Sequence, residues 1–60
     1  MKRYMVVSIV DGMQYAYFTD EYLQAEQYRM DCECGMGGYA EVYERQTDED
    51  GVDSYVFSYA

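Results

Sequence analysis

Two cysteines separated by one residue, Cys32 and Cys34, are the side chains in this sequence most suited to binding a soft metal ion. Structural zinc sites hold four ligands, commonly in two pairs, and the chain has no histidine and no further cysteine. Four thiolates would require a symmetric dimer. Because free cysteine more often packs as a small buried hydrophobe, we expect no metal and no other cofactor, with Cys32 and Cys34 the only metal candidates.

The glycine-rich segment GMGG, from Gly35 to Gly38, raises the question of a phosphate-binding loop. It lacks the spacing of a dinucleotide fingerprint and the lysine of a phosphate loop, and it follows a predicted helix rather than opening one. We therefore interpret the segment as a helix stop and a crossing loop, with Gly35 as the left-handed residue that ends the helix.

The acidic segment DEDGVD, residues 48–53, invites comparison with a calcium loop. When Gly51 is aligned with the invariant glycine of an EF-hand, Gln46 falls on the first ligand position and Phe57 on the bidentate glutamate position. Neither residue fits its role. The segment is predicted instead to be an acidic hairpin turn with Gly51 at positive φ.

The charge balance limits the possible functions, since twelve acidic and four basic residues give a formal charge of −8. A field of this sign repels nucleic-acid phosphates and anionic lipid head groups, and it favours basic partners. The absence of histidine removes the usual general base, and a small sheet under one helix leaves little room for a cleft that shifts a pKa. We expect no enzymatic activity, no direct nucleic-acid binding and no membrane association.

The chain is predicted to be a single small domain, residues 1–60, in the cytoplasm. The apolar run from Met5 to Val10 is closed by Asp11 before it reaches the length of a signal-peptide core or a membrane span, so we expect no leader and reduced cysteines. The chain has nine tyrosines, and half of its residues are hydrophobic, which argues against disorder. A chain this short buries only about 60% of its unfolded surface, so self-association is an open possibility.

Four strands and one helix are predicted. Asp11 and Gly12 lie between two β-rich runs and predict a type I′ hairpin, in which Val10 faces Met13 and the pairing continues to Tyr4 and Thr19. Residues 19–33 predict a helix whose first amides are capped by Thr19 or Asp20, and residues 39–45 and 53–59 alternate as strands. The order predicts an α+β fold, ββαββ, with a four-stranded antiparallel sheet and one helix packed on one face.

A single helix covers one sheet face, so side-chain alternation divides the strands into two sets. The set expected beneath the helix is small and aliphatic: Met5, Val7, Ile9, Ala16, Phe18, Ala40, Val42 and Val56. The opposite set, expected on the uncovered face, comprises Tyr4, Val6, Tyr15, Tyr17, Tyr39, Tyr43, Tyr55, Phe57 and Tyr59. On the helix, one stripe holds Ala25, Tyr28 and Cys32 and another holds Leu23, Met30 and Cys34, and the sequence does not decide which is buried.

Seven of the nine tyrosines would then share an open surface, and these are the predicted partner-binding residues. Tyrosine supplies large contact area at little rotamer cost and tolerates water when no partner is bound. The first hypothesis is a small non-enzymatic interaction protein that uses this face to form a homodimer or to bind another protein. A plainer interpretation is that the rings only coat a solvated sheet.

An alternative hypothesis is an acidic mimic of nucleic acid, of the kind found in phages and mobile elements, that occupies the basic groove of a partner protein. Its carboxylates would come from the helix, from the third strand and from the following turn: Asp20, Glu21, Glu26, Asp31, Glu33, Glu41, Glu44 and residues 48–50. Binding of this kind weakens steeply with salt.

Overall fold

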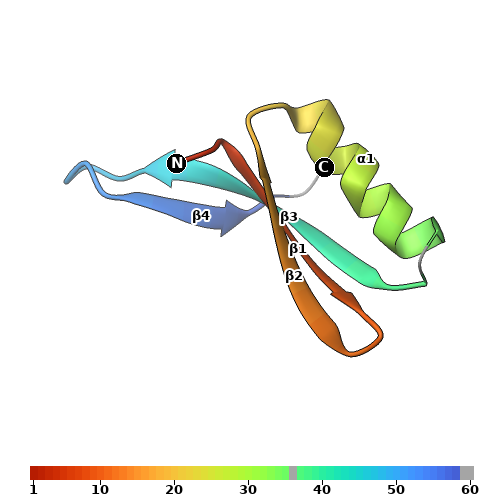
Figure 1. The fold of residues 1–60 in the computed structure, drawn as a ribbon. Helices are drawn as coiled ribbons and strands as arrows, with labels where there is room; N and C mark the ends of the chain where they lie inside the picture. The colour runs from red at the N-terminus through yellow and green to blue at the C-terminus, as the bar shows by residue number, and fades with distance from the viewer. Residues whose placement is uncertain (36, 59–60) are drawn as a thin grey trace.

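The computed structural model describes residues 1–35 and 37–58, and in them it shows one antiparallel sheet, one α-helix and a short π-helix. The elements are β1 (Tyr4–Val10), β2 (Met13–Thr19), α1 (Tyr22–Met30), the π-helical turn η1 (Asp31–Gly35), β3 (Tyr39–Thr47) and β4 (Asp53–Phe57). The strand order is β2-β1-β3-β4, and α1 packs across β1, β3 and β2 (Figure 1). The predicted ββαββ fold with its helix on one face is confirmed.

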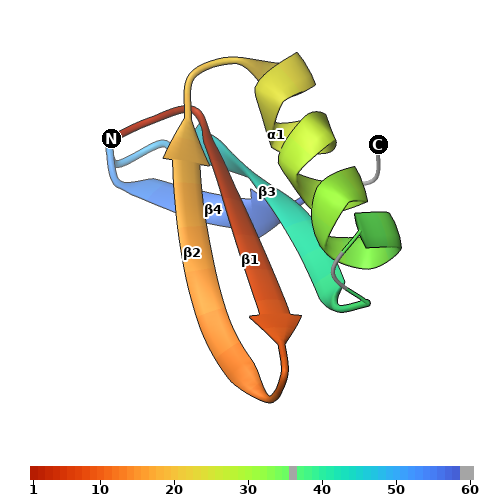
Figure 2. The same ribbon diagram turned by 45° about the vertical axis from the view of Figure 1, so that its right-hand side comes forward.

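The molecule is elongated, 39 × 22 × 18 Å along its principal axes. The cause lies in β4, which pairs only with residues 43–47, the half of β3 farther from the helix. The β3–β4 hairpin therefore extends away from α1 (Figure 1). The opposite edge of the sheet is formed by β2, the outer strand of the β1–β2 hairpin (Figure 2).

The β1–β2 hairpin forms as the sequence predicts. Asp11 and Gly12 have φ angles of 53° and 78°, as a type I′ turn requires. Val10 pairs with Met13, and all seven predicted pairs as far as Tyr4 and Thr19 are present. The turn sets this register locally, because its two residues allow only one pairing of the flanking strands.

The pairing of β1 with β3 decides which side of the sheet the helix covers. Val6 lies opposite Val42, and Ser8 lies opposite Ala40, and all four residues are buried. The apolar core contains Tyr4, Val6, Ala25, Cys32, Ala40 and Val42, with Tyr17 and Tyr28 packed against it. The even-numbered residues of β1 thus face the helix, opposite to the expectation from the sequence.

The helix buries the stripe that contains Ala25 and Cys32, both of which are fully buried. Two aromatic contacts flank this stripe. The Tyr22 ring meets the Tyr4 ring edge-on at 5.5 Å, and the Tyr28 ring stacks on Tyr17 at 4.6 Å between centroids. The other stripe, formed by Leu23, Met30 and Cys34, faces outward.

Both ends of the helix differ from the expected caps. The N-cap residue is Glu21, and Thr19 accepts a hydrogen bond from the Glu21 amide through Oγ1 without capping the helix itself. Asp20 turns back to the N-terminus, where it accepts hydrogen bonds from the Arg3 amide and from Lys2 Nζ. The hydrogen bonds to Lys2 and Arg3 outweigh the preference of aspartate for capping a helix. The sequence alone shows only the capping preference.

The segment after the helix uses its glycines differently from the prediction. Gly35 ends η1 without a positive φ, whereas Gly37 has a φ of 66°. Gly38 packs so closely on the end of β1 that a Cβ there would lie 2.5 Å from the Ile9 carbonyl oxygen. The Gly38 amide donates to the Cys32 carbonyl oxygen at 2.8 Å. Close approach of backbones, rather than phosphate binding or a helix stop, explains the glycine at position 38.

The acidic turn between β3 and β4 has the predicted positive φ at Gly51, 79°. The Asp48 carboxylate folds back over the turn and accepts hydrogen bonds from the amides of Asp50 and Val52, each at 2.9 Å. The Asp48 side chain is therefore occupied in holding the turn.

Candidate functional site

The seven tyrosines predicted to share the open face do not do so. Tyr4, Tyr15 and Tyr17 alternate with Met5, Ala16 and Phe18, and their register places them on the side of the sheet that the helix covers. Tyr39, Tyr43 and Tyr55 lie on the uncovered side, and Tyr59 lies outside the described residues. The expectation is wrong for the hairpin because β1 presents apolar side chains on both of its faces, so hydrophobicity alone does not choose between them.

The uncovered side is instead a mixed aliphatic and aromatic surface, which we call the open face. Its members follow from the three strand registers: Met5, Val7, Ile9, Gln14, Ala16, Phe18, Tyr39, Glu41, Tyr43, Arg45, Thr47, Asp53, Tyr55 and Phe57. Five of the eight residues expected beneath the helix, Met5, Val7, Ile9, Ala16 and Phe18, belong here. Ala40, Val42 and Val56 do lie on the helix side, as predicted.

Large apolar side chains on the open face are solvent-accessible. Ile9, Phe18, Tyr39 and Phe57 expose between 40% and 56% of their surface. Monomeric proteins rarely expose contiguous apolar patches of more than a few hundred Å², and larger ones mark interaction sites. Each of the four strands contributes one of these exposed apolar side chains to the open face.

An aromatic cluster forms the part of the open face nearest β4. The ring centroids of Tyr43 and Phe57 are 5.7 Å apart, and those of Phe18 and Tyr55 are 6.0 Å apart although β2 and β4 are opposite edges of the sheet. The twist of the sheet brings these edges together. The Tyr55 hydroxyl donates to the Lys2 carbonyl oxygen at 2.8 Å, which anchors this ring.

Charge is sparse on the open face, where Glu41, Arg45 and Asp53 are the only charged residues. Arg45 donates through Nη1 to the Met1 carbonyl oxygen, and the Tyr43 hydroxyl donates to Glu41. A hydrogen bond to Glu41 raises the pKa of Tyr39, and loss of hydration followed by the Glu41 charge raises the pKa of Tyr43. The phenols therefore remain protonated at neutral pH and serve as hydrogen-bond donors.

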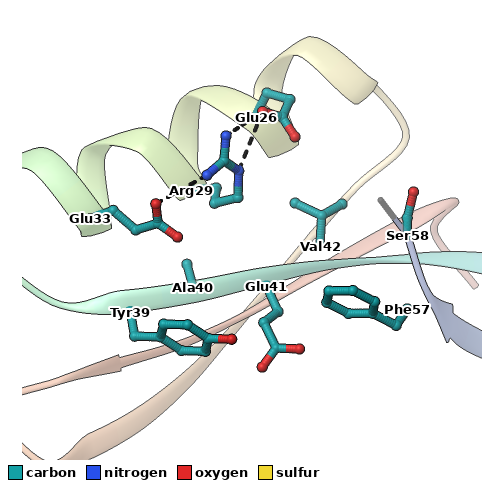
Figure 3. A pocket seen from close by; sticks show the side chains of 9 residues that line it. All are labelled: Glu26, Arg29, Glu33, Tyr39, Ala40, Glu41, Val42, Phe57 and Ser58. Carbon is teal, nitrogen blue, oxygen red and sulfur yellow. Dashed lines mark hydrogen bonds and ion pairs between the residues drawn. The ribbon is translucent and has the colours of Figure 1, made fainter. Parts of the chain in front are cut away.

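A cleft of about 270 Å³ lies between α1 and β3 and is lined by Glu26, Arg29, Glu33 and Tyr39, among others (Figure 3). Arg29 bridges the two helix carboxylates, donating to Glu26 at 2.8 Å and to Glu33 at 3.1 Å. The hydrogen bond from Arg29 lowers the pKa of Glu26, and the same bond raises the pKa of Arg29. The cleft is smaller than typical ligand pockets of about 300–1,000 Å³, and its lining sets three carboxylates against the single guanidinium of Arg29.

The two cysteines point in different directions. Cys32 is fully buried in the core beside Ala25, whereas Cys34 is exposed. Within residues 1–35 and 37–58, no group of three or more acidic, cysteine or histidine side chains is arranged to hold a metal ion. One chain therefore does not bring both thiols to a common ion.

No protein-family model matches this chain, and searches of curated proteins and of solved structures found no match. In the part of the chain that the structure describes, no helix has the length and apolar character needed to cross a membrane. The site must therefore be interpreted from its own geometry.

The sequence contains one signal that would have placed the missed residues, above all Ile9 and Phe18, on the open face. Ser8 and Ala40 are small, and two small residues side by side in a sheet let a helix approach closely over them. Ser8 lies in the same alternating set as Val6, and Ala40 in the same set as Val42. Matching these two sets would have placed Ile9 and Phe18 on the open face.

Proposed function

We propose that this protein is a small non-enzymatic interaction module that binds another protein through the open face of its sheet. The observation that carries the proposal is the exposure of Ile9, Phe18, Tyr39 and Phe57 together on a sheet face that no other element of the described chain covers. Aromatic residues are enriched at the centres of protein interfaces, where charged residues are depleted.

The distribution of charge favours a partner with an apolar centre and a basic rim. Six of the twelve acidic residues lie on α1, on η1 or in the turn after β3, whereas the open face carries only two, Glu41 and Asp53. A basic rim would be attracted by the net charge of −8, which speeds encounter and sets specificity more than affinity. A second acidic copy lacks this attraction.

The alternative, an acidic mimic that fills a basic groove, draws less support from the arrangement of its carboxylates. Asp20 pairs with Lys2, and Glu26 and Glu33 both pair with Arg29. Asp48 is engaged with the backbone of its own turn. These contacts within the chain reduce the charge available for a groove.

Site-specific photo-cross-linking tests the proposal. We would replace Tyr39 with benzoylphenylalanine, a similar aromatic side chain, and irradiate the protein in an extract of its native cells. Leu23, which is 80% exposed on the outer side of α1, provides the matched control position. The proposal predicts a discrete cross-linked protein from position 39, competed away by unlabelled protein, and none from position 23.

Three other results would count against it. Equal cross-linking from both positions would indicate non-specific contact. A cross-link to a second copy from position 39 would identify the chain itself as the occupant of the face. Cross-linking confined to position 23 and abolished by moderate salt would favour the acidic mimic.

A further inference from the structure

The outer edge of the sheet at β2 offers a second and different surface, made of backbone rather than side chains. β2 spans Met13–Thr19, seven residues without a charge, a proline or a glycine. Natural edge strands are usually protected by lysine, proline, bulges or short length. The opposite edge, β4, has five residues, begins at Asp53 and follows the acidic turn. β2 has none of these protections.

The direction of the β2 backbone groups follows from the ladder. The Arg45 amide donates to the Arg3 carbonyl oxygen at 2.7 Å, which extends the β1–β3 pairing. In antiparallel strands alternate residues bond to opposite neighbours, so the odd-numbered residues of β1 bond to β3 and the even-numbered ones bond to β2. The β2 partners of those even-numbered residues are Met13, Tyr15, Tyr17 and Thr19.

The intervening residues, Gln14, Ala16 and Phe18, therefore direct their amides and carbonyls away from the sheet. These six groups are spaced symmetrically about Ala16. When two β2 strands meet antiparallel across a two-fold axis at Ala16, Gln14 of each copy lies opposite Phe18 of the other. Each outward amide of one strand then faces a carbonyl of the other, which gives six hydrogen bonds in all. A shift of the pairing by two residues would leave only four of these hydrogen bonds.

We propose that the protein forms a homodimer in which β2 pairs antiparallel with β2 of a second copy, centred on Ala16. The result is a continuous eight-stranded sheet with both helices on one side and both open faces on the other. Such a two-fold interface is self-complementary by construction. The proposal concerns the edge and does not depend on what the open face binds.

The side chains agree with this register. Tyr15 is 46% exposed although it lies on the helix side of the sheet, because it projects beyond the helix-covered core. In the dimer Tyr15 lies opposite Tyr17 of the second copy, whose ring already stacks on its own Tyr28. Aromatic pairs directly across antiparallel strands stabilise a sheet.

The charges at the ends of the paired strands oppose the dimer. In the register centred on Ala16, the Asp11-Gly12 turn of one copy lies beside the segment that follows Thr19 of the other, so Asp11 comes near Glu21 once at each end. Like charges brought close together repel each other, and salt screens the repulsion. The dimer should therefore become tighter as sodium chloride is raised, whereas contacts between unlike charges would loosen.

Sedimentation equilibrium of the full chain provides the first test. The average mass of the wild-type protein should rise with protein concentration towards twice 7.1 kDa, and further with added salt. Ala16→Pro removes an outward amide without removing a β1–β2 hydrogen bond, as proline allows on an edge strand, and should remain at 7.1 kDa. Tyr39→Ser, on the open face, should dimerise like the wild type.

A disulfide test fixes the register and does not require the proline variant to fold. In a Cys34→Ser background, Ala16→Cys places two thiols across the axis on strands whose Cα atoms are about 5.5 Å apart, within the range for a disulfide. Gln14→Cys places its two thiols four residues out of register. Mild oxidation should form a disulfide between two copies of the first variant and none between copies of the second.

The proposal is overturned by a wild-type chain that stays monomeric at every concentration and salt, or by equal cross-linking of both cysteine variants. Loss of the dimer in Tyr39→Ser with retention in Ala16→Pro would also overturn it and would place self-association on the open face. None of these results alters the cross-link to a different protein expected from position 39, so the two proposals fail separately.

Discussion

Replacing Gly38 with alanine introduces a methyl group where the loop after the helix meets the end of β1. Its carbon would lie 2.5 Å from the Ile9 carbonyl oxygen and 2.7 Å from Val10 Cγ2. Restoring an ordinary contact of 3.4 Å requires the loop to move about 0.9 Å from Ile9 (3.4 − 2.5), which stretches the 2.8 Å hydrogen bond from the Gly38 amide to Cys32.

Overpacking of this kind costs about 1–3 kcal/mol, and the lower chain entropy of alanine in the unfolded state returns about 0.4–1 kcal/mol. We expect the free energy of unfolding to fall by about 1–2 kcal/mol. In a domain this small, each kcal/mol lowers Tm by about 4–8 °C, so a decrease of about 4–16 °C should appear in a thermal melt followed by circular dichroism.

The two neighbouring glycines provide matched controls. A Cβ at Gly35 would meet nothing within 4 Å, and Gly35 has no positive φ, so Gly35→Ala should be neutral or stabilising by up to about 1 kcal/mol. Gly37 also has open space but a φ of 66°, so Gly37→Ala should cost about 1 kcal/mol through backbone strain alone. A Gly38→Ala variant as stable as Gly35→Ala would refute the close packing of this loop.

Three further outcomes are expected. Ser8 Oγ is buried without a hydrogen-bond partner among the described residues, so Ser8→Ala should raise the free energy of urea unfolding by about 1 kcal/mol; a clear decrease would mean that the hydroxyl is satisfied. The hydrogen bond from the Arg3 amide lowers the pKa of Asp20 below its usual 3.8, so its contribution is complete above pH 3.8 and disappears as the pH falls towards the lowered value. Asp20→Asn should therefore flatten the acid limb of stability, and an unchanged limb would contradict this. A double-mutant cycle that replaces Tyr17 and Tyr28 with leucine should give a coupling of about 0.5–1.5 kcal/mol, and additive losses would argue against the stack.

Local features of this fold were predictable from the sequence because short-range geometry fixes them. The Asp11-Gly12 turn sets every pair of the β1–β2 hairpin, and Gly51 takes the positive φ expected of the second turn. The order of the elements was sufficient to give one helix over one antiparallel sheet. The number of residues in a two-residue turn leaves no freedom in the register that follows it.

The face of the sheet that the helix covers was not predictable in the same way. β1 and β3 are separated in the chain by β2 and the helix, so no turn fixes their register, and a shift of one residue exchanges the two faces. β1 is apolar on both faces, with Val6 on one and Val7 on the other. The candidate site inherited this error, because the prediction placed Tyr4 and Tyr17 on the open face when their rings pack against the helix.

The predicted helix cap was wrong for a related reason. Asp20 has the sequence context of a helix cap, yet it binds the N-terminal backbone at Arg3, seventeen residues away. Such a partner is visible only once the fold has brought the two segments together. The same holds for Gly38, whose lack of a side chain is required by β1 rather than by the helix that precedes it.

The open face exists only if β1 turns Val6 towards the helix and Val7 away from it, and a pair of Val→Thr substitutions measures this directly. Threonine keeps the shape and β-branching of valine and adds one hydroxyl. Val6 is fully buried and Val7 is half-buried at the surface. Burial of a hydroxyl without a partner costs about 1–3 kcal/mol, so Val6→Thr should lower the urea midpoint clearly while Val7→Thr leaves it nearly unchanged. Equal losses, or a larger loss at position 7, would contradict the account.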